Sequence, residues 1–235
     1  MPGVLLAGRV GRATWFYLAL IIFSVLGTLA TTCLNVDPGP IKPVSATLTL
    51  LLAAFLSLRS FVSRSGSRGL LSVFLVGLLG VNVELAGVFT GFPFGRYRYT
   101  DQWVPVVHLP RLGFFPLLIP VAWLFVSASC YFIVSSRVTG PGAVVAGGLL
   151  GGLLDLLMEP AMTDRLHYWT WLSRGPLPGG VPISNFLSWC VLCMVAGALF
   201  RWADKGDVKF PREPLIALLG QLVLTATIWL CGIYH

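Results

Sequence analysis

Hydrophobic residues occur along this chain in long, nearly unbroken runs, separated by short polar segments that contain Gly, Pro and Arg. A helix that crosses the ~30 Å hydrocarbon core of a bilayer needs about 20 mostly apolar residues, so runs of this length predict membrane-spanning helices. Turn-forming residues separate the runs, and no internal repeat is evident. The runs that qualify are 13–34, 41–58, 69–89, 112–134, 141–158, 183–200 and 214–233. The pattern predicts an all-α, polytopic membrane bundle of about seven transmembrane helices, built as a single integral membrane domain over residues 1–235.

The composition supports a membrane protein and excludes a soluble one. Hydrophobic residues make up 56% of the 235 residues, charged residues make up 11%, and the mean hydropathy is +0.85. A soluble domain carries about 25% charged residues, so this chain cannot cover its surface with hydrated groups. The net charge of +7 is spread among loops. We therefore expect contact with membrane lipid headgroups, and no binding of nucleic acid.

Basic residues in the loops predict the orientation, because cytoplasmic loops carry an excess of Lys and Arg. With seven spans, the side of the N-terminus holds ten basic residues and the opposite side holds six. The ten are Arg9, Arg12, Arg59, Arg64, Arg68, Arg137, Arg201, Lys205, Lys209 and Arg212, and the six are Lys42, Arg96, Arg98, Arg111, Arg165 and Arg174. The first run is too long for the apolar part of a signal peptide, so we expect an uncleaved first span. The prediction is a protein of the plasma (inner) membrane with a cytoplasmic N-terminus.

Acidic and amide side chains near the ends of spans are the most informative polar positions, because such groups are costly in a bilayer and mark function. Glu84 lies near the end of the third span, and Asn185 lies near the start of the sixth. Asp155 lies near the end of the fifth span, with Glu159 four residues later on the same helical face. Odd-numbered spans end and even-numbered spans begin at the outer face. These four side chains should therefore gather at one depth, in a site opposite the cytoplasm.

Two segments at that face, 90–101 and 162–171, are rich in aromatic residues and arginine. An aromatic belt with arginines on lipid phosphates explains their composition, but it does not explain the acids. His108 and His167 are isolated candidates for carrying protons, and bonding to backbone or water is the alternative for both.

Small residues occur at helical spacing in two later spans. Cys190 and Cys193 form a C-x-x-C pair, but no His or second Cys pair completes a tetrahedral set, so we expect buried side chains and no metal. Gly148 and Gly152 form one of two small-x-x-x-small patterns, which predict either a close approach of two helices or a slot for a flat ligand.

Three sequence blocks resemble the CruF-type carotenoid hydratases, a family of membrane proteins of carotenoid biosynthesis. The first block reads ELAGVFTGFPFGRYRY over residues 84–99, and the second reads PLLIPVAW over residues 116–123. The third reads DLLMEPAM over residues 155–162 and is followed by WTW at 169–171 and GVPISNF at 180–186. The resemblance covers a core of about 69–200. Leu154 and Glu159 stand where the family usually has Trp and Asp.

The resemblance implies the addition of water to the terminal C=C of an acyclic carotenoid end group, such as that of lycopene or γ-carotene, with no cofactor. A carboxylic acid protonates the alkene, and water captures the tertiary cation. Asp155 is the expected proton donor, Glu159 its partner or relay, and Glu84 and Asn185 the groups that position water; these roles are interchangeable at this stage. Residues expected to contact the substrate are Phe94, Arg96, Tyr97, Arg98, Tyr99, Trp123, Trp169 and Trp171, with Arg96 or Arg98 also pairing with a carboxylate.

Three other functions fit part of the pattern. A lycopene cyclase uses the same protonation, but an internal alkene captures the cation, so its product is an isomer of the substrate. A proton or solute transporter would have ionisable groups distributed through the depth of the bundle, whereas here they cluster at one end. A subunit that only binds pigment would not explain the acidic residues near the ends of the spans. Self-association and association with other enzymes of carotenoid biosynthesis stay open.

Overall fold

Six α-helices and four short strands make up the residues that the computed structural model describes, which are 11–37, 39–204 and 212–231. Arg9, Lys205 and Lys209 of the charge count lie outside these residues. The helices are α1 (Arg12–Cys33), α2 (Ile41–Thr90), α3 (Ile119–Ser135), α4 (Pro141–Pro160), α5 (Ile183–Ala203) and α6 (Arg212–Cys231). The strands are β1 (Tyr97–Tyr99), β2 (Val106–Leu109), β3 (Gly113–Pro116) and β4 (Trp169–Trp171). A π-helical turn, η1 (Ala161–Arg165), continues α4, and a short 3-10 turn, η2 (Pro178–Gly180), precedes α5.

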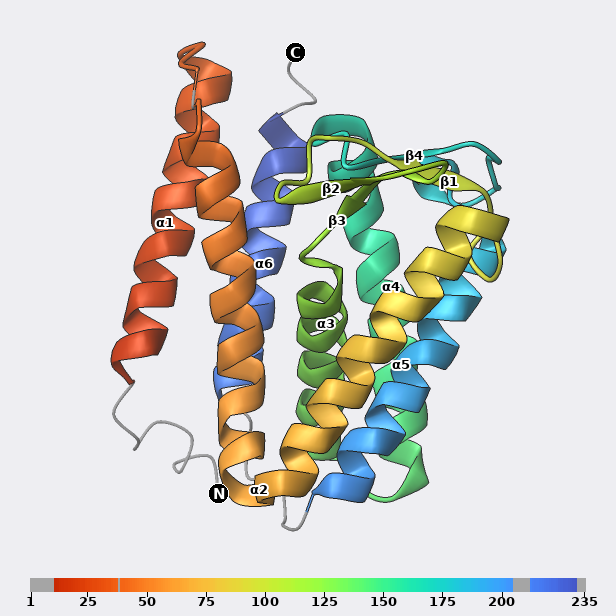
Figure 1. Ribbon diagram of the computed structural model, residues 1–235. Helices are drawn as coiled ribbons and strands as arrows, with labels where there is room; N and C mark the ends of the chain where they lie inside the picture. The colour runs from red at the N-terminus through yellow and green to blue at the C-terminus, as the bar shows by residue number, and fades with distance from the viewer. Residues whose placement is uncertain (1–10, 38, 205–211, 232–235) are drawn as a thin grey trace.

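Helix α2 contains both the second and the third predicted spans. Its backbone breaks at Gly66, whose φ of 59° and ψ of −133° suit a residue without a Cβ. The chain reverses there, so that one limb of α2 descends and the other rises (Figure 1). The described residues therefore form six helices and not seven separate ones. Five of them are long and apolar enough to cross a membrane, and α3, with 17 residues, is shorter.

The fourth predicted span begins too early in the sequence. The prediction started it at residue 112, but α3 begins at Ile119, because β3 pairs with β2 in an antiparallel hairpin just before the helix. Pro116 and Pro120 lack the backbone N–H that an upstream extension of the helix would need. The aromatic segments expected as loops likewise contain short strands, β1 and β4, which pair with each other.

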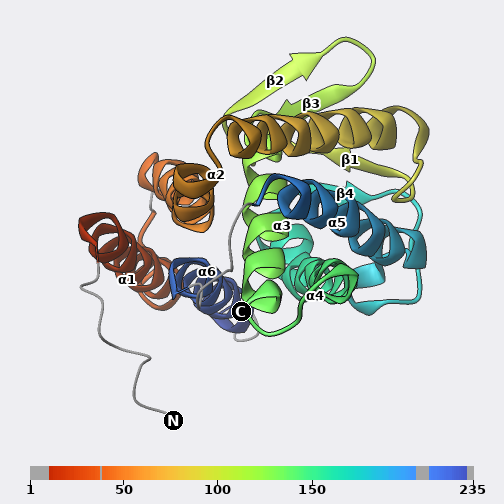
Figure 2. The same ribbon diagram turned by 90° about the horizontal axis from the view of Figure 1, so that it is seen from below.

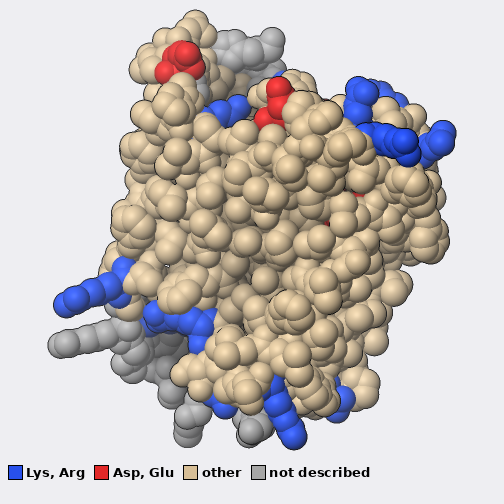
Figure 3. All heavy atoms as spheres, in the orientation of Figure 1, with Lys and Arg blue, Asp and Glu red and all other residues tan. Residues whose placement is uncertain are grey.

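The helices form two neighbouring groups, as the view from below shows (Figure 2). Helices α3, α4 and α5 pack with the second limb of α2, whereas α1 and α6 lie beside the first limb (Figures 1 and 2). Large apolar side chains such as Trp15 and Phe16 of α1 are 62% and 59% exposed. On the face that Figure 3 shows, charged residues gather toward the two ends of the molecule, and a wide belt with almost no charged atoms lies between them. This belt has the character of a lipid-facing surface.

The glycines of α4 allow α5 to approach closely. A Cβ added to Gly152 would lie 2.3 Å from the sulfur of Cys190, and one added to Gly151 would lie 2.6 Å from the sulfur of Cys193. Both cysteines are free thiols and buried. The small-residue patterns therefore serve helix packing, which brings the acids of α4 close to Asn185 of α5.

Candidate active site

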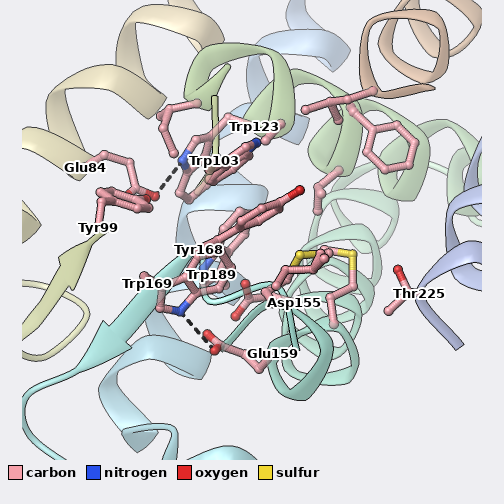
Figure 4. Close-up of a pocket in the computed structure, with 18 of the residues that line it drawn as sticks. Glu84, Tyr99, Trp103, Trp123, Asp155, Glu159, Tyr168, Trp169, Trp189 and Thr225 are labelled. Atoms are coloured by element: carbon pink, nitrogen blue, oxygen red, sulfur yellow. Dashed lines mark hydrogen bonds between the residues drawn. The ribbon is translucent and has the colours of Figure 1, made fainter. Parts of the chain in front are cut away.

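A cavity of about 150 Å³ brings the predicted acids together. Glu84 of α2, Asp155 and Glu159 of α4, and Asn185 of α5 all line it. Each of these four side chains is buried, with 5% or less of the residue exposed. Glu84 lies on one side, and Asp155 and Glu159 lie on the other, with aromatic rings between them (Figure 4). This space is termed the acid cavity.

Three aromatic side chains hold the carboxylate of Glu84. The hydroxyls of Tyr97 and Tyr99 donate to Oε2 over 2.6 and 2.8 Å, and the indole N–H of Trp123 donates to Oε1 over 3.1 Å. Burial raises the pKa of both phenols, and the negative charge of Glu84 raises it further. Both tyrosines therefore keep their protons and act as donors.

Two glycines on the same face of α2 make room for these donors. Gly80 lies four residues before Glu84, and Gly87 lies three residues after it, so all three share one helical face. A Cβ on Gly80 would lie 2.6 Å from the ring of Trp123, and one on Gly87 would lie 2.6 Å from the hydroxyl of Tyr97. The two glycines thus leave the space that Trp123 and Tyr97 occupy on either side of the carboxylate.

Indole and amide groups hold Glu159 in a similar way. The N–H groups of Trp169 and Trp171 donate to Oε2 over 3.2 and 3.1 Å. The amide nitrogen of Asn185 lies 3.2 Å from Oε1 of Glu159 and 2.8 Å from Oδ2 of Asp155. One amide group therefore connects the two carboxyls of α4.

The donors to the two glutamates come from one small sheet. Strands β1 and β4 pair in antiparallel register, with Tyr97 opposite Trp171 and Tyr99 opposite Trp169. Side chains two residues apart on a strand share a face, so these four rings lie on the side that covers the acid cavity. The sheet is a lid whose inner face binds both glutamates.

The structure does not bring Arg96 and Arg98 to the acid cavity, which corrects the expected pairing of one of them with a carboxylate. Both residues are exposed, and neither lines the acid cavity. No ion pair joins either of them to a carboxylate in the described part of the chain. The reason is strand geometry, because inward Tyr97 and Tyr99 alternate with outward arginines.

Aromatic rings make up much of the remaining wall. Trp189 was not predicted, and its ring stacks on that of Trp123 with centroids 4.0 Å apart and an angle of 3° between the planes. It follows Asn185 by four residues on α5, a spacing that places both on one helical face and could have identified it. The predicted aromatic residues that line the cavity are Phe94, Tyr97, Tyr99, Trp123, Trp169 and Trp171.

The wall opposite the lid comes from the first limb of α2 and from α6, which includes Leu224 and Thr225. Gln221 also lines it, and its amide nitrogen is buried with no hydrogen-bond partner among the described residues. Tyr168 lies at the edge of this wall, stacked on Trp103 with centroids 5.3 Å apart, and burial raises its pKa to about 12.

The two histidines considered as proton carriers lie away from the acid cavity. His108 is exposed on β2, beside the ring of Phe114. His167 is exposed as well, and its Nδ1 lies 3.0 Å from the carbonyl oxygen of Thr163. His167 therefore bonds to the backbone, which was the alternative expected for both histidines.

Comparisons with known proteins place this cavity inside a matched region. A family model described as carotenoid biosynthesis protein matches residues 44–233, which include every residue that lines the acid cavity. Bisanhydrobacterioruberin hydratase of Haloarcula japonica is 26% identical over 165 residues, which are 68% of this chain and 54% of that protein. The chain thus spans about half the length of this curated relative. No solved structure matches it.

Proposed function

The chain belongs to the carotenoid biosynthesis protein family, and from that premise we propose that it is a hydratase that adds water to the terminal C=C of an acyclic carotenoid end group. A carboxylic acid transfers a proton to the less substituted carbon, which leaves a tertiary cation. Water binds the cation through its oxygen, and its surplus proton passes to a carboxylate. The π bond and an O–H bond break, a C–H and a C–O bond form, and no electrons are gained or lost.

The charge balance of the acid cavity supports acid chemistry. Three carboxyl groups line it, and no Lys, Arg or His lines it among the described residues. Three unpaired negative charges in a buried, aromatic environment would be very costly. At least one carboxyl group therefore holds a proton, which is what protonation of an alkene requires.

The hydrogen bonds of the three carboxyl groups single out Asp155, and this observation carries the proposal. Both oxygens of Glu84, both oxygens of Glu159 and Oδ2 of Asp155 accept hydrogen bonds from side chains. Oδ1 of Asp155 accepts none from the residues that the structure describes. A proton on this oxygen has no protein acceptor, so it is free for an alkene in the cavity.

The neighbouring groups support the remaining roles. Glu84 uses three of its roughly four acceptor sites, which leaves one for a water molecule. The amide of Asn185 donates to both Asp155 and Glu159 and so holds the two carboxyls near each other, and Glu159 can accept the proton that water releases. Trp123 and Trp189 both line the cavity, and an indole face that is not covered by the other ring is suited to stabilise the tertiary cation.

The size of the cavity supports a reaction at an end group. A cavity of about 150 Å³ holds a molecule the size of benzene. One terminal isoprenoid unit has this size, and a whole carotenoid is far larger. We infer that one end of lycopene or γ-carotene reacts at a time, while the rest of the molecule lies outside the acid cavity.

The position of the cavity near one end of the bundle supports a supply of water. We propose that both limbs of α2 and the short helix α3 cross the plasma membrane, which gives seven crossings. With a cytoplasmic N-terminus, the lid of β1 and β4 then faces the outer side. Water reaches the end group there without crossing the hydrocarbon core.

Expression in a lycopene-producing bacterium, with mass analysis of the pigments, tests the proposal. A hydratase yields a product that has gained one water, whereas a cyclase yields an isomer of equal mass. Asp155→Asn should abolish the hydrated product, because a general acid contributes about 10²–10⁴-fold to a rate. Asp164→Asn, which changes an exposed acid nine residues further on, is the matched control. Full activity of Asp155→Asn would remove Asp155 from the acid role.

A further inference from the structure

The acid cavity is much too small for a whole carotenoid. An extended carotenoid is about as long as the hydrocarbon core is thick, ~30 Å, whereas the cavity holds a group the size of benzene. If the proposed function holds, most of the polyene must lie elsewhere on the protein or in lipid. Two further cavities lie in a row beside the acid cavity and offer room for it.

A second cavity of about 380 Å³ adjoins the acid cavity, between α1, the first limb of α2 and α6. It is termed the α1 groove, and its α1 wall includes Phe23, Gly27 and Thr31. The residues that line both cavities are Ala46, Leu166, Tyr168 and Leu224. Because four residues line both spaces, the two cavities are neighbours, and Tyr168 is one of the residues between them.

The α1 groove also continues to the outside of the bundle. A third cavity, of about 260 Å³, lies between α1 and α2 and shares Phe23, Ile41 and Ser45 with the groove. Its other walls include the exposed apolar residues Val44 and Leu48. α1 lies at the edge of the molecule, beside the first limb of α2 and α6 (Figure 2). The path thus opens sideways, toward the belt of apolar surface.

The α1 groove is lined by two charged residues, Lys42 and Arg165, and otherwise by apolar side chains and by hydroxyls, several of which already have partners within the protein. Hydroxyls of Thr28 and Thr31 donate to backbone carbonyls of α1 over 2.9 and 2.8 Å. Ser24 and Ser45 bond each other across α1 and α2 over 2.5 Å. With these hydroxyls engaged, the side chains present mainly methyl and methylene groups. A long apolar molecule suits such a surface.

We propose that the polyene chain of the substrate enters between α1 and α2 and lies in the α1 groove, with its end group reaching past Tyr168 into the acid cavity. The inference rests on the proposed function for the identity of the occupant. The groove then selects substrates by the length and straightness of the chain behind the reacting end group, and it contributes to binding and not to the chemical step.

Filling the groove tests this assignment. A Cβ on Gly27 would meet no atom within 4 Å, so a side chain has room to begin there, and Gly27→Phe places a ring at the wall of the groove. It should raise KM for lycopene about tenfold and leave kcat within about twofold, as expected for loss of uniform binding. Leu26→Phe, one residue away and 60% exposed, is the control and should change neither constant. An unchanged KM for Gly27→Phe would overturn the proposal.

A binding measurement separates this proposal from the proposed reaction. A photoreactive benzophenone amino acid placed at position 27 of the full chain, reconstituted with lycopene in phospholipid vesicles, should link to lycopene, and one at position 26 should link to phospholipid. Linkage of lycopene at position 27 without hydrated product would refute the reaction and retain the path. Linkage of phospholipid alone at position 27, with hydrated product formed, would refute the path and retain the reaction.

Discussion

Replacement of Gly80 by alanine should damage the active site, although Gly80 itself bonds to nothing in it. The added Cβ would lie 2.6 Å from two ring carbons of Trp123 and 2.8 Å from its Cβ, where ordinary contact begins near 3.4 Å. Relief of the overlap requires a shift of about 0.8 Å, the difference between 3.4 and 2.6 Å. Because Glu84 is on the same helix as Gly80, Trp123 must move away from the carboxylate that it binds.

The expected change in the free energy of unfolding combines two costs and one gain. Overpacking of a buried site costs about 1–3 kcal/mol, and loss of a hydrogen bond to a charged group costs about 1.5–3 kcal/mol. Replacement of glycine by alanine within a helix stabilises the helix by about 1 kcal/mol. The free energy of unfolding should therefore fall by roughly 1.5–5 kcal/mol. A loss of 1.4–2.8 kcal/mol in transition-state binding would lower the rate about 10–100-fold.

Gly77→Ala is the matched control, because Gly77 is also a buried glycine on α2, one turn earlier. Its Cβ would meet Pro120 at 3.7 Å and Leu124 at 3.8 Å, which are ordinary contacts. This variant should keep the wild-type product and unfold at the same or a higher temperature. Both variants can be compared by thermal unfolding in detergent and by the yield of hydrated pigment in a lycopene-producing bacterium.

The reasoning fails if Gly80→Ala and Gly77→Ala behave alike. Wild-type pigment yield and unfolding temperature in Gly80→Ala would mean that Trp123 has room to move without leaving Glu84. Loss of folding in both variants would mean that α2 tolerates no side chain on this face, whatever the role of Trp123.

Three further variants test other parts of the site. Trp171→Phe removes one of the two indole donors to Glu159, and its rate of hydration should fall about tenfold, since a hydrogen bond to a charged group is worth about 1.5–3 kcal/mol; an unchanged rate would separate the lid from the chemistry. Arg98→Ala should keep product formation within about twofold of wild type, because the side chain points outward, and a large loss of hydrated pigment would contradict this. Gly152→Leu should yield little folded protein by size-exclusion chromatography, because the new Cβ would lie 2.3 Å from the sulfur of Cys190; normal yield would show that α4 and α5 can separate.

The helices could be predicted because hydrophobic length is a local property of the sequence. The sixth predicted span, 183–200, begins where α5 begins, at Ile183, and ends within one turn of its end. The errors occur where local chemistry competes with hydropathy. Residues 112–118 are apolar enough for a span, but Gly113 and Pro116 favour a hairpin, and the structure places β3 there.

The lid was missed although its signal is present. Tyr97-Arg98-Tyr99 and Trp169-Thr170-Trp171 each alternate large aromatic and polar residues, the period of a strand with one buried face. A segment of three residues is too short for this alternation to favour a strand over an aromatic belt at the membrane surface. The two segments also pair across about 70 residues, and no local feature of the sequence predicts such a pairing. Reading the alternation would have separated the tyrosines from Arg96 and Arg98.

The apolar side of the acid cavity could not be predicted. The acids stand out because they are costly within a membrane, but Leu224 and Thr225 resemble any other residues of an apolar helix. Their place in the wall depends on how α6 packs against α2, which involves residues more than 100 positions apart. The α1 groove arises in the same way.

The pairing of β1 with β4 constrains how the sequence of this protein can evolve. Because each strand holds a different glutamate, a substitution that loosens the pair alters the surroundings of both acids together. If the proposed function holds, selection for a new end group cannot readily reshape one half of the acid cavity while sparing the other. The proposed α1 groove does not depend on this strand pair, so adaptation to longer or shorter pigments is expected to accumulate on the helices that line it, among them α1 and α6.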